Sequence, residues 1–168
     1  MIIQKPEVWL RGPITNIPSF LQPVAHALLQ AREEIEALMK DFKDEDLWQK
    51  PAGLASVAFH LQHLRGVLDR LFTYARAQQL SSTQLADLKA EGIFNETLTV
   101  QQLVAAFDKQ VSSSINELML VNEAQLLEPR VVGRANIPTN MLGLYVHAAE
   151  HTMRHLGQLL VTVKVVET

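Results

Sequence analysis

The sequence HAAEHTMRHLGQLL, residues 147–160, is the most informative segment of the chain. Three histidines in it, His147, His151 and His155, recur at intervals of four residues. A four-residue step on an α-helix stacks side chains on one face, each one turn above the last. The segment is otherwise largely apolar, so it predicts a packed helix that carries imidazoles at positions where leucine is the ordinary choice.

Apolar residues recur at steps of three and four in this segment and in three others, which predicts four long helices. The predicted ranges are about 19–42, 54–79, 99–121 and 141–166, with a short helix at about 83–90. Ser56 is placed to cap the second helix, and Thr99-Val-Gln-Gln resembles a capping box before the third. We expect an all-α fold, an antiparallel four-helix bundle with long connections between helices. An irregular all-α domain is the alternative.

The length, charge and amino-acid composition of the chain limit the classes of function that it can have. The 168 residues predict a single domain, 1–168, with an extended N-terminal arm at 1–17. The net charge of −3 and the lack of a dominant basic patch argue against nucleic acid as a partner. We expect no signal peptide and no membrane span, and a cytoplasmic location. The chain has no cysteine, so a metal would need histidine, carboxylate or water ligands.

A helical wheel places the histidines relative to the core. His151 and His155 fall within the apolar arc of the last helix, and His147 lies at its edge. In the second helix His60 flanks the leucine stripe, and His63 is rotated further outward on the same side. The residues that define the apolar arc of the last helix are Met141, Leu144, Ala148, Leu159 and Val166.

Two imidazoles on a core face raise a physical problem. Leaving a ring nitrogen buried without a partner costs about 1–3 kcal/mol, and protonating both rings would set like charges one turn apart. A divalent cation takes a lone pair from each neutral ring and removes both difficulties. A third ligand from a facing helix would complete a site with open positions. The alternative is that each histidine simply bonds to a backbone carbonyl or carboxylate in the core.

His147, Glu150 and His151 also spell HxxEH, the motif of inverted zinc proteases, in which the glutamate acts as general base. The motif is short, and the wheel directs Glu150 away from His151 and His155. Nothing else in the chain suggests a large protease domain. We therefore set the protease interpretation aside.

Two segments, ASVAFHLQHL at 55–64 and EHTMRHLGQLL at 150–160, resemble the DinB/YfiT-like superfamily of small four-helix-bundle proteins. The resemblance extends over most of the chain in helix order and length. It implies a metal site with His63, His151 and His155 as ligands. His60 and His147 are additional histidines, and His60 is the alternative to His63 because it lies closer to the core stripe. The family usually has tryptophan where this chain has Ala55.

The resemblance also implies a divalent cofactor, Zn, Ni, Fe or Mn, and one of two activities. These are metal-dependent hydrolysis and transfer that uses a low-molecular-weight thiol as cosubstrate. Arg154, Gln158 and Arg11 are candidates for the substrate pocket.

The alternative from a different class is a non-catalytic metal-binding or ligand-binding protein, or a structural dimer. Apolar residues also cover the opposite side of the last helix, which predicts a homodimer. They are Leu142, Val146, Met153, Leu156 and Leu160.

Overall fold

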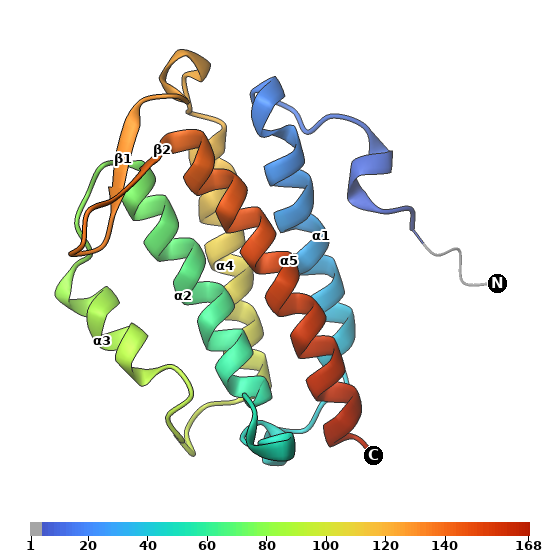
Figure 1. The fold of residues 1–168 in the computed structure, drawn as a ribbon. Coiled ribbons are helices and arrows are strands. Elements are labelled where there is room, and N and C mark those ends of the chain that lie inside the picture. Colours follow the sequence, from blue (N-terminus) through green and yellow to red (C-terminus); the bar gives the residue numbers. More distant parts are fainter. Residues whose placement is uncertain (1–4) are drawn as a thin grey trace.

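The structure, a computed structural model, describes residues 5–168. It is mostly helical, with five α-helices and one small two-stranded sheet (Figure 1). In chain order the elements are α1 Gln22–Met39, α2 Val57–Ala75, α3 Ser82–Ala90, α4 Val100–Leu118, β1 Pro129–Val132, β2 Ile137–Asn140 and α5 Met141–Val166. The prediction of a helical fold is confirmed, and the predicted helix at 141–166 has the same bounds as α5.

The four long helices, α1, α2, α4 and α5, pack side by side. Helices α1 and α2 each pack closely against both α4 and α5. Figure 1 shows that α1 and α5 run in one direction and α2 and α4 in the other. Two of the four close pairs, α2 with α5 and α1 with α4, are therefore antiparallel, and the other two are parallel. Helices α1 and α2 follow each other in the chain but are not one of these close pairs, and the same is true of α4 and α5. Helices α2 and α4 are close but parallel, so all three connections must be long, as the sequence predicts.

The helix starts follow from local hydrogen bonding. The Ser56 side chain accepts a hydrogen bond from the backbone N–H of Phe59 and caps α2. At α4 the side chains of Thr99 and Gln102 form a complete capping box. Both caps confirm the sequence-based expectation. They fix the first turn of two helices that pack against each other.

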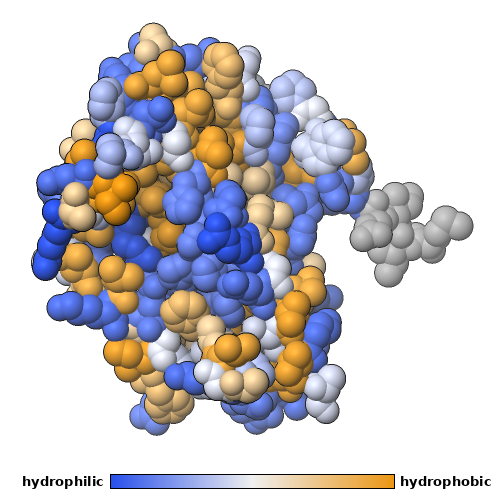
Figure 2. All heavy atoms as spheres, viewed as in Figure 1, coloured by the Kyte–Doolittle hydropathy of each residue, from blue (hydrophilic) through white to orange (hydrophobic). Residues whose placement is uncertain are grey.

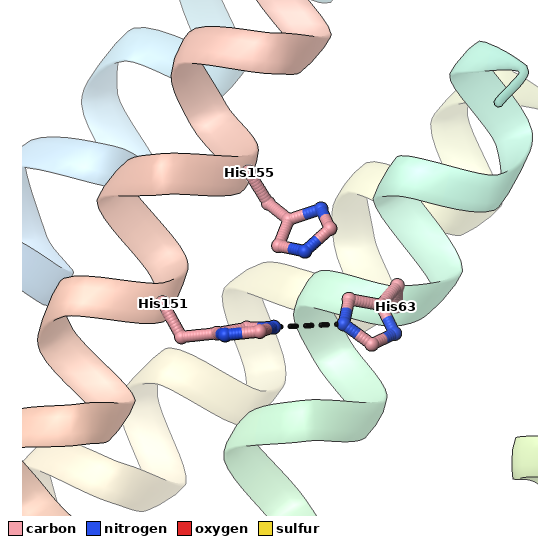
Figure 3. A group of neighbouring side chains, drawn as sticks. All are labelled: His63, His151 and His155. Carbon is pink, nitrogen blue, oxygen red and sulfur yellow. Dashed lines mark hydrogen bonds between the residues drawn. The ribbon is translucent and has the colours of Figure 1, made fainter. Parts of the chain in front are cut away.

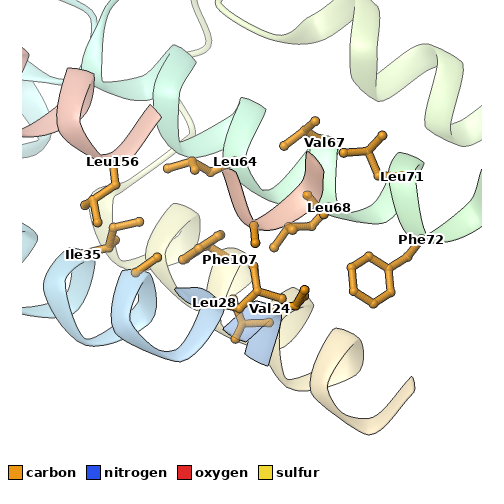
Figure 4. Packing of buried hydrophobic residues seen from close by; sticks show 14 of the residues in the cluster. Val24, Leu28, Ile35, Leu64, Val67, Leu68, Leu71, Phe72, Phe107 and Leu156 are labelled. Carbon is orange, nitrogen blue, oxygen red and sulfur yellow. The ribbon is translucent and has the colours of Figure 1, made fainter. Parts of the chain in front are cut away.

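The core lies between the four long helices. Leu64 and Leu68 of α2 are completely buried, as are Leu28 and Ile35 of α1. Figure 4 shows these side chains meeting Phe107 of α4 and Leu156 of α5. Removing this much apolar surface from water is the main source of stability in such a fold. It also holds α2 against α5, the pair of helices that carries the histidines.

Two expectations about α5 need correction. His151 and His155 are only half-buried, so they lie at the border of the core rather than inside it. Leu156, which was expected on the outward side, is 3% exposed and belongs to the core. The buried stripe of α5 runs through Ala148, Thr152, Leu156 and Leu159. It is rotated away from the two histidines because α5 packs against both α1 and α2.

The hairpin β1–β2 was not predicted. Its strands are antiparallel, with Pro129 opposite Asn140 and Val132 opposite Ile137. The turn between them has positive φ at Gly133 (66°) and Asn136 (50°), which glycine and asparagine tolerate best. Asn140 then caps α5 through its side chain, which accepts a hydrogen bond from Gly143 N–H. The hairpin thus sets where α5 begins.

The predicted N-terminal arm at 1–17 falls in part on residues 1–4, which lie outside the described residues. From residue 5 the arm is not fully extended, because Val8–Arg11 forms a turn of 3-10 helix. The backbone N–H of Val8 donates to Gln30 of α1 at 2.8 Å. The single-domain assignment stays a prediction.

Among the helices of residues 5–168, none combines the length and the hydrophobicity that a membrane crossing requires.

Candidate metal centre

A cluster of three histidines lies between α2 and α5. His63 comes from α2, and His151 and His155 come from successive turns of α5 (Figure 3). One ring nitrogen from each residue lies within 4.8 Å of the others. The cluster depends on the close packing of α2 against α5, which brings together side chains 88 positions apart in sequence. The three predicted ligands are therefore neighbours in space.

Two like nitrogen atoms face each other in this cluster. The Nε2 atoms of His63 and His151 are 2.9 Å apart, so only one of them can carry a proton (Figure 3). The Nδ1 of His155 faces Nδ1 of His60 at 3.2 Å, which leaves its other ring nitrogen on the side of the His63–His151 pair. Three imidazole nitrogens thus converge, a donor set that suits a divalent transition metal.

Glu91 determines which nitrogen of His63 carries the proton. Its Oε2 lies 2.7 Å from His63 Nδ1, and its Oε1 accepts a hydrogen bond from Arg70 Nη1 at 2.6 Å. An ionised carboxylate only accepts hydrogen bonds, so His63 Nδ1 is the donor. In the tautomer with its proton on Nδ1, His63 holds a lone pair on Nε2, which lies 2.9 Å from Nε2 of His151. Metal-binding histidines usually donate their other ring N–H in this way, to a carboxylate, a backbone carbonyl or water.

The electrostatics favour neutral rings. Burial, followed by the proximity of His63 and His151, lowers the pKa of His155 to about 4. Burial and then His63 also lower the pKa of His151. Burial opposes ionisation of Glu91, but its hydrogen bonds with His63 and Arg70 outweigh that effect and lower the pKa of the Glu91 carboxyl. Neutral imidazoles with free lone pairs are the form that binds a cation.

His151 and His63 differ in how firmly the protein holds them. Nδ1 of His151 is buried and has no hydrogen-bond partner among the described residues, so no protein group holds that end of the ring. The ring of Phe59, by contrast, stacks on His63 with centroids 5.3 Å apart and planes 11° apart. His63 is held by Phe59 and Glu91. His151 has no such partner at Nδ1, so its ring can carry the proton there and present Nε2 to a cation. The residues present therefore fit a divalent cation.

Comparisons with known proteins agree with the resemblance seen in the sequence. The model of the DinB superfamily matches residues 27–159, which include His63, His151 and His155. The chain belongs to the DinB superfamily. The crystal structure of a conserved protein from Enterococcus faecalis is similar, with a TM-score of 0.68 and 20% sequence identity over 87% of this chain and 96% of that one. That likeness shows the fold alone. A search of the curated proteins found no significant match.

The two additional histidines of this DinB protein lie on either side of the cluster. His60 is 4% exposed, and its Nδ1 contacts His155, as expected of the residue closer to the core. His147 is half-exposed and forms a second group with Glu150 and His151, whose ligand atoms lie within 4.8 Å of one another. The wheel wrongly directed Glu150 away from His151. Its carboxylate is also paired with Arg154, on the solvent-facing side of α5.

Figure 2 shows a hydrophilic band across the middle of the face that α2 and α5 form, with hydrophobic residues above and below it. Beside the histidines in this DinB protein is an open pocket of about 510 Å³, which His60, Arg154 and Gln158 help to line. Its other lining residues are mostly small or apolar: Leu54, Ala55, Gly157, Val161 and Thr162. Arg154 and Gln158, two of the three residues predicted for the substrate pocket, thus line the same pocket.

Arg11 is not part of this pocket. Its guanidinium donates to both carboxylate oxygens of Glu33 on α1, at 2.6 and 2.7 Å, so it anchors the N-terminal arm. Sequence reasoning also missed Glu91, which no spacing rule connects to His63. One signal was present: Gly66 interrupts a leucine-rich helical pattern, and such a glycine can have a packing reason.

Proposed function

We propose that α1, α2, α4 and α5 act as a four-helix bundle that holds a divalent metal ion with His63, His151 and His155. One observation carries the proposal: three imidazole nitrogens converge within 4.8 Å, and a buried carboxylate ties the far nitrogen of one of the rings. Three protein ligands leave a coordination position open, as in catalytic sites. Imidazole ligands suit Zn, Ni, Fe and Mn.

We further propose that the protein is a metal-dependent enzyme acting on small molecules, with transfer of a low-molecular-weight thiol as the favoured reaction. A bound cation would supply the Lewis acidity that lowers the pKa of water or of a thiol. Both carboxylates that contact the histidines are engaged, Glu91 by Arg70 and Glu150 by Arg154. Neither is free to serve as base for a water molecule, whereas a thiol has a pKa of about 8.5 and needs less assistance.

The pocket supports a substrate with an apolar body and one polar end. Leu54 and Val161 offer apolar contacts, and Arg154 and Gln158 offer hydrogen-bond donors. A thiol cosubstrate also agrees with a reducing compartment such as the cytoplasm.

We also propose that two chains associate through α5. Val146, Met153 and Leu160, all among the predicted dimer contacts, are between 36% and 51% exposed on this helix. Sedimentation of the protein, compared with a Val146→Asp/Leu160→Asp variant, tests the association. A monomeric wild-type protein would contradict it.

The decisive experiment is metal analysis of the untagged protein beside His155→Ala. We expect stoichiometric metal in the wild-type protein and little in the variant. His26→Ala is the matched control, because His26 bonds to Gly12 O on another part of the surface. Equal metal content in all three proteins would refute the site. The metal-loaded protein is then incubated with an apolar electrophile, with and without cysteine or glutathione. Conversion without thiol would identify a hydrolase instead.

A further inference from the structure

A notch at Gly66 on α2 is filled by an ion pair. A Cβ atom added to Gly66 would lie 2.5 Å from Glu91 Oε1 and 2.6 Å from Arg70 Nη1, closer than such atoms approach. Glycine in a helix interior is less favourable than alanine by about 1 kcal/mol. The chain therefore accepts a poor helix former at the place where the Glu91 carboxylate lies over α2.

The two oxygens of Glu91 have separate partners. Oε1 is bound by Arg70, and Oε2 is bound by Nδ1 of His63. The side chains of Glu91 and Arg70 are only 7% and 10% exposed. A buried ion pair of this kind has little freedom to rearrange, because either charge alone would be left without compensation. Arg70 thus fixes the direction in which Glu91 presents its second oxygen.

Helix α3 delivers Glu91, which directly follows its last residue. None of the residues of α3 is buried, so the helix adds little to the core. Polar contacts hold it and the next loop on α2: Arg65 with Asp87 at 2.6 Å, Gln84 with Thr73 at 2.8 Å, and Gly92 N–H with Gln62 at 2.8 Å. An open pocket of about 470 Å³ lies between α2, α3 and α4. The position of α3 is therefore explained by Glu91, which it places beside His63.

We propose that Glu91 is a positioning residue of the metal centre, seated by Arg70 and the Gly66 notch. Through Nδ1 of His63 it keeps Nε2 of that ring unprotonated and directed at the cation position. This inference rests on the proposed metal site. It makes the affinity for a divalent cation depend on α3 and Gly66, although neither supplies a ligand.

The first test is Glu91→Gln, with Co²⁺ affinity and the visible absorption spectrum of bound Co²⁺ as readouts. A glutamine that keeps its oxygen toward Arg70 turns its NH₂ group toward His63 Nδ1, which moves the ring proton to Nε2. Loss of such a second contact typically lowers metal affinity about 10- to 100-fold. We also expect an altered spectrum in the Co²⁺ that still binds, because one imidazole is displaced. A purely structural role would leave the spectrum unchanged.

The second test is Gly66→Ala, which removes no polar group and replaces glycine with a better helix former. The added methyl group displaces Glu91 and Arg70 from the notch, so we expect Co²⁺ affinity to fall about tenfold or more. The matched control is Gly143→Ala near the start of α5, where an added Cβ atom would crowd Thr139 and Asn140, at 2.8 and 3.1 Å, instead of Glu91 and Arg70. We expect its Co²⁺ affinity to equal that of the wild-type protein. If Glu91→Gln does not fold, the comparison of Gly66→Ala with its control still tests the positioning role of Glu91.

The outcomes separate the two proposals. A wild-type protein that binds no Co²⁺ would refute the metal site and this inference with it. A wild-type protein that binds Co²⁺ no more tightly than Gly66→Ala and folded Glu91→Gln would refute the positioning role alone and leave the metal site standing.

Discussion

Two stripes of side chains run along α2, and they differ in what they require from the rest of the chain. The apolar stripe consists of completely buried residues: Leu61, Leu64 and Leu68. The polar stripe runs beside it at steps of three and four residues, and its positions are His60, His63, Gly66, Arg70 and Thr73. Burial does not distinguish them, because His60, Arg70 and Thr73 are also less than 9% exposed.

The apolar and polar stripes differ in the contacts that their residues require. A leucine is satisfied by any apolar neighbour of suitable shape, so several helices can serve. A buried polar group needs a particular atom at a particular distance. His63 meets His151 of α5 and Glu91 after α3, and Thr73 accepts from Gln84 of α3. The polar stripe therefore gathers residues from distant parts of the sequence, and a site can form there.

The largest effect on stability is expected from the apolar stripe. Replacing Leu68 by alanine leaves a cavity in the core, and we expect the free energy of unfolding to fall by about 2–5 kcal/mol. Denaturant titration measures the change. Leu120→Ala, at a position that is 86% exposed, is the control and should lie within about 0.5 kcal/mol of the wild-type protein. Metal affinity of the folded Leu68→Ala protein should hardly change. A parallel loss of affinity would show that the two stripes are not independent.

The polar stripe should stabilise the protein only when the cation is bound. At free metal about 100 times above the dissociation constant, binding adds about 2.7 kcal/mol to the free energy of unfolding. A chelator should remove this increment from the wild-type protein. Thermal unfolding with and without chelator measures it, and His155→Ala should show no difference. An equal chelator effect on both proteins would mean that the cation binds elsewhere.

The apolar stripe explains why much of the fold was predictable. Leucine periodicity and caps are local signals, and they placed the long helices and their starts at Ser56 and Thr99. The histidines His151 and His155 were also found locally, since one helix presents them a turn apart. Their partner on α2 followed from the family resemblance rather than from the wheel, which favoured His60.

The features of the fold and of the site that the sequence did not predict depend on tertiary packing. Glu91 lies 28 positions from His63, and only the docking of α3 brings them together. Leu156 is buried because α5 packs against two helices, which a single wheel does not anticipate. The strands of the hairpin are four residues long and contain no buried residue, and their sequences, PRVV and IPTN, have no clear alternation of apolar residues. Arg11 was a pocket candidate because its segment could fold back over the mouth of the bundle, with anchoring of the N-terminal arm as the alternative. Its pairing with Glu33 of α1 is a tertiary contact that supports the anchoring role.

A smaller effect is expected where both stripes begin. Ser56 is completely buried, and its hydroxyl accepts the hydrogen bond that satisfies Phe59 N–H. Removing such a cap typically costs about 1 kcal/mol. We expect Ser56→Ala to lose about that much stability in denaturant titration, and Ser56→Thr to retain most of it. Equal losses in both variants would indicate packing around Ser56 rather than capping.

The smallest effect is expected beyond the other end of the polar stripe, where Arg76 pairs with Glu117 of α4. Burial raises the pKa of Glu117, and the nearby Arg76 does not fully offset it. A carboxyl with a raised pKa holds its proton more tightly in the folded state than in the unfolded chain. Its contribution to stability is therefore fully present below the unfolded value of 4.5 and is lost as pH rises through the folded value.

Glu117→Gln removes this titration. We expect the stability of the wild-type protein relative to Glu117→Gln to be greatest in acid and to decline as pH rises from about 4 to 7. Denaturant titrations of both proteins across that range measure the difference. A difference that instead grew with pH would mean that Arg76 stabilises the ionised carboxylate more than burial opposes it, as Arg70 and His63 do for Glu91. Glu91, which pairs with Arg70, and Glu117, which pairs with Arg76, would then follow the same rule, and the contrast between the two carboxylates would disappear.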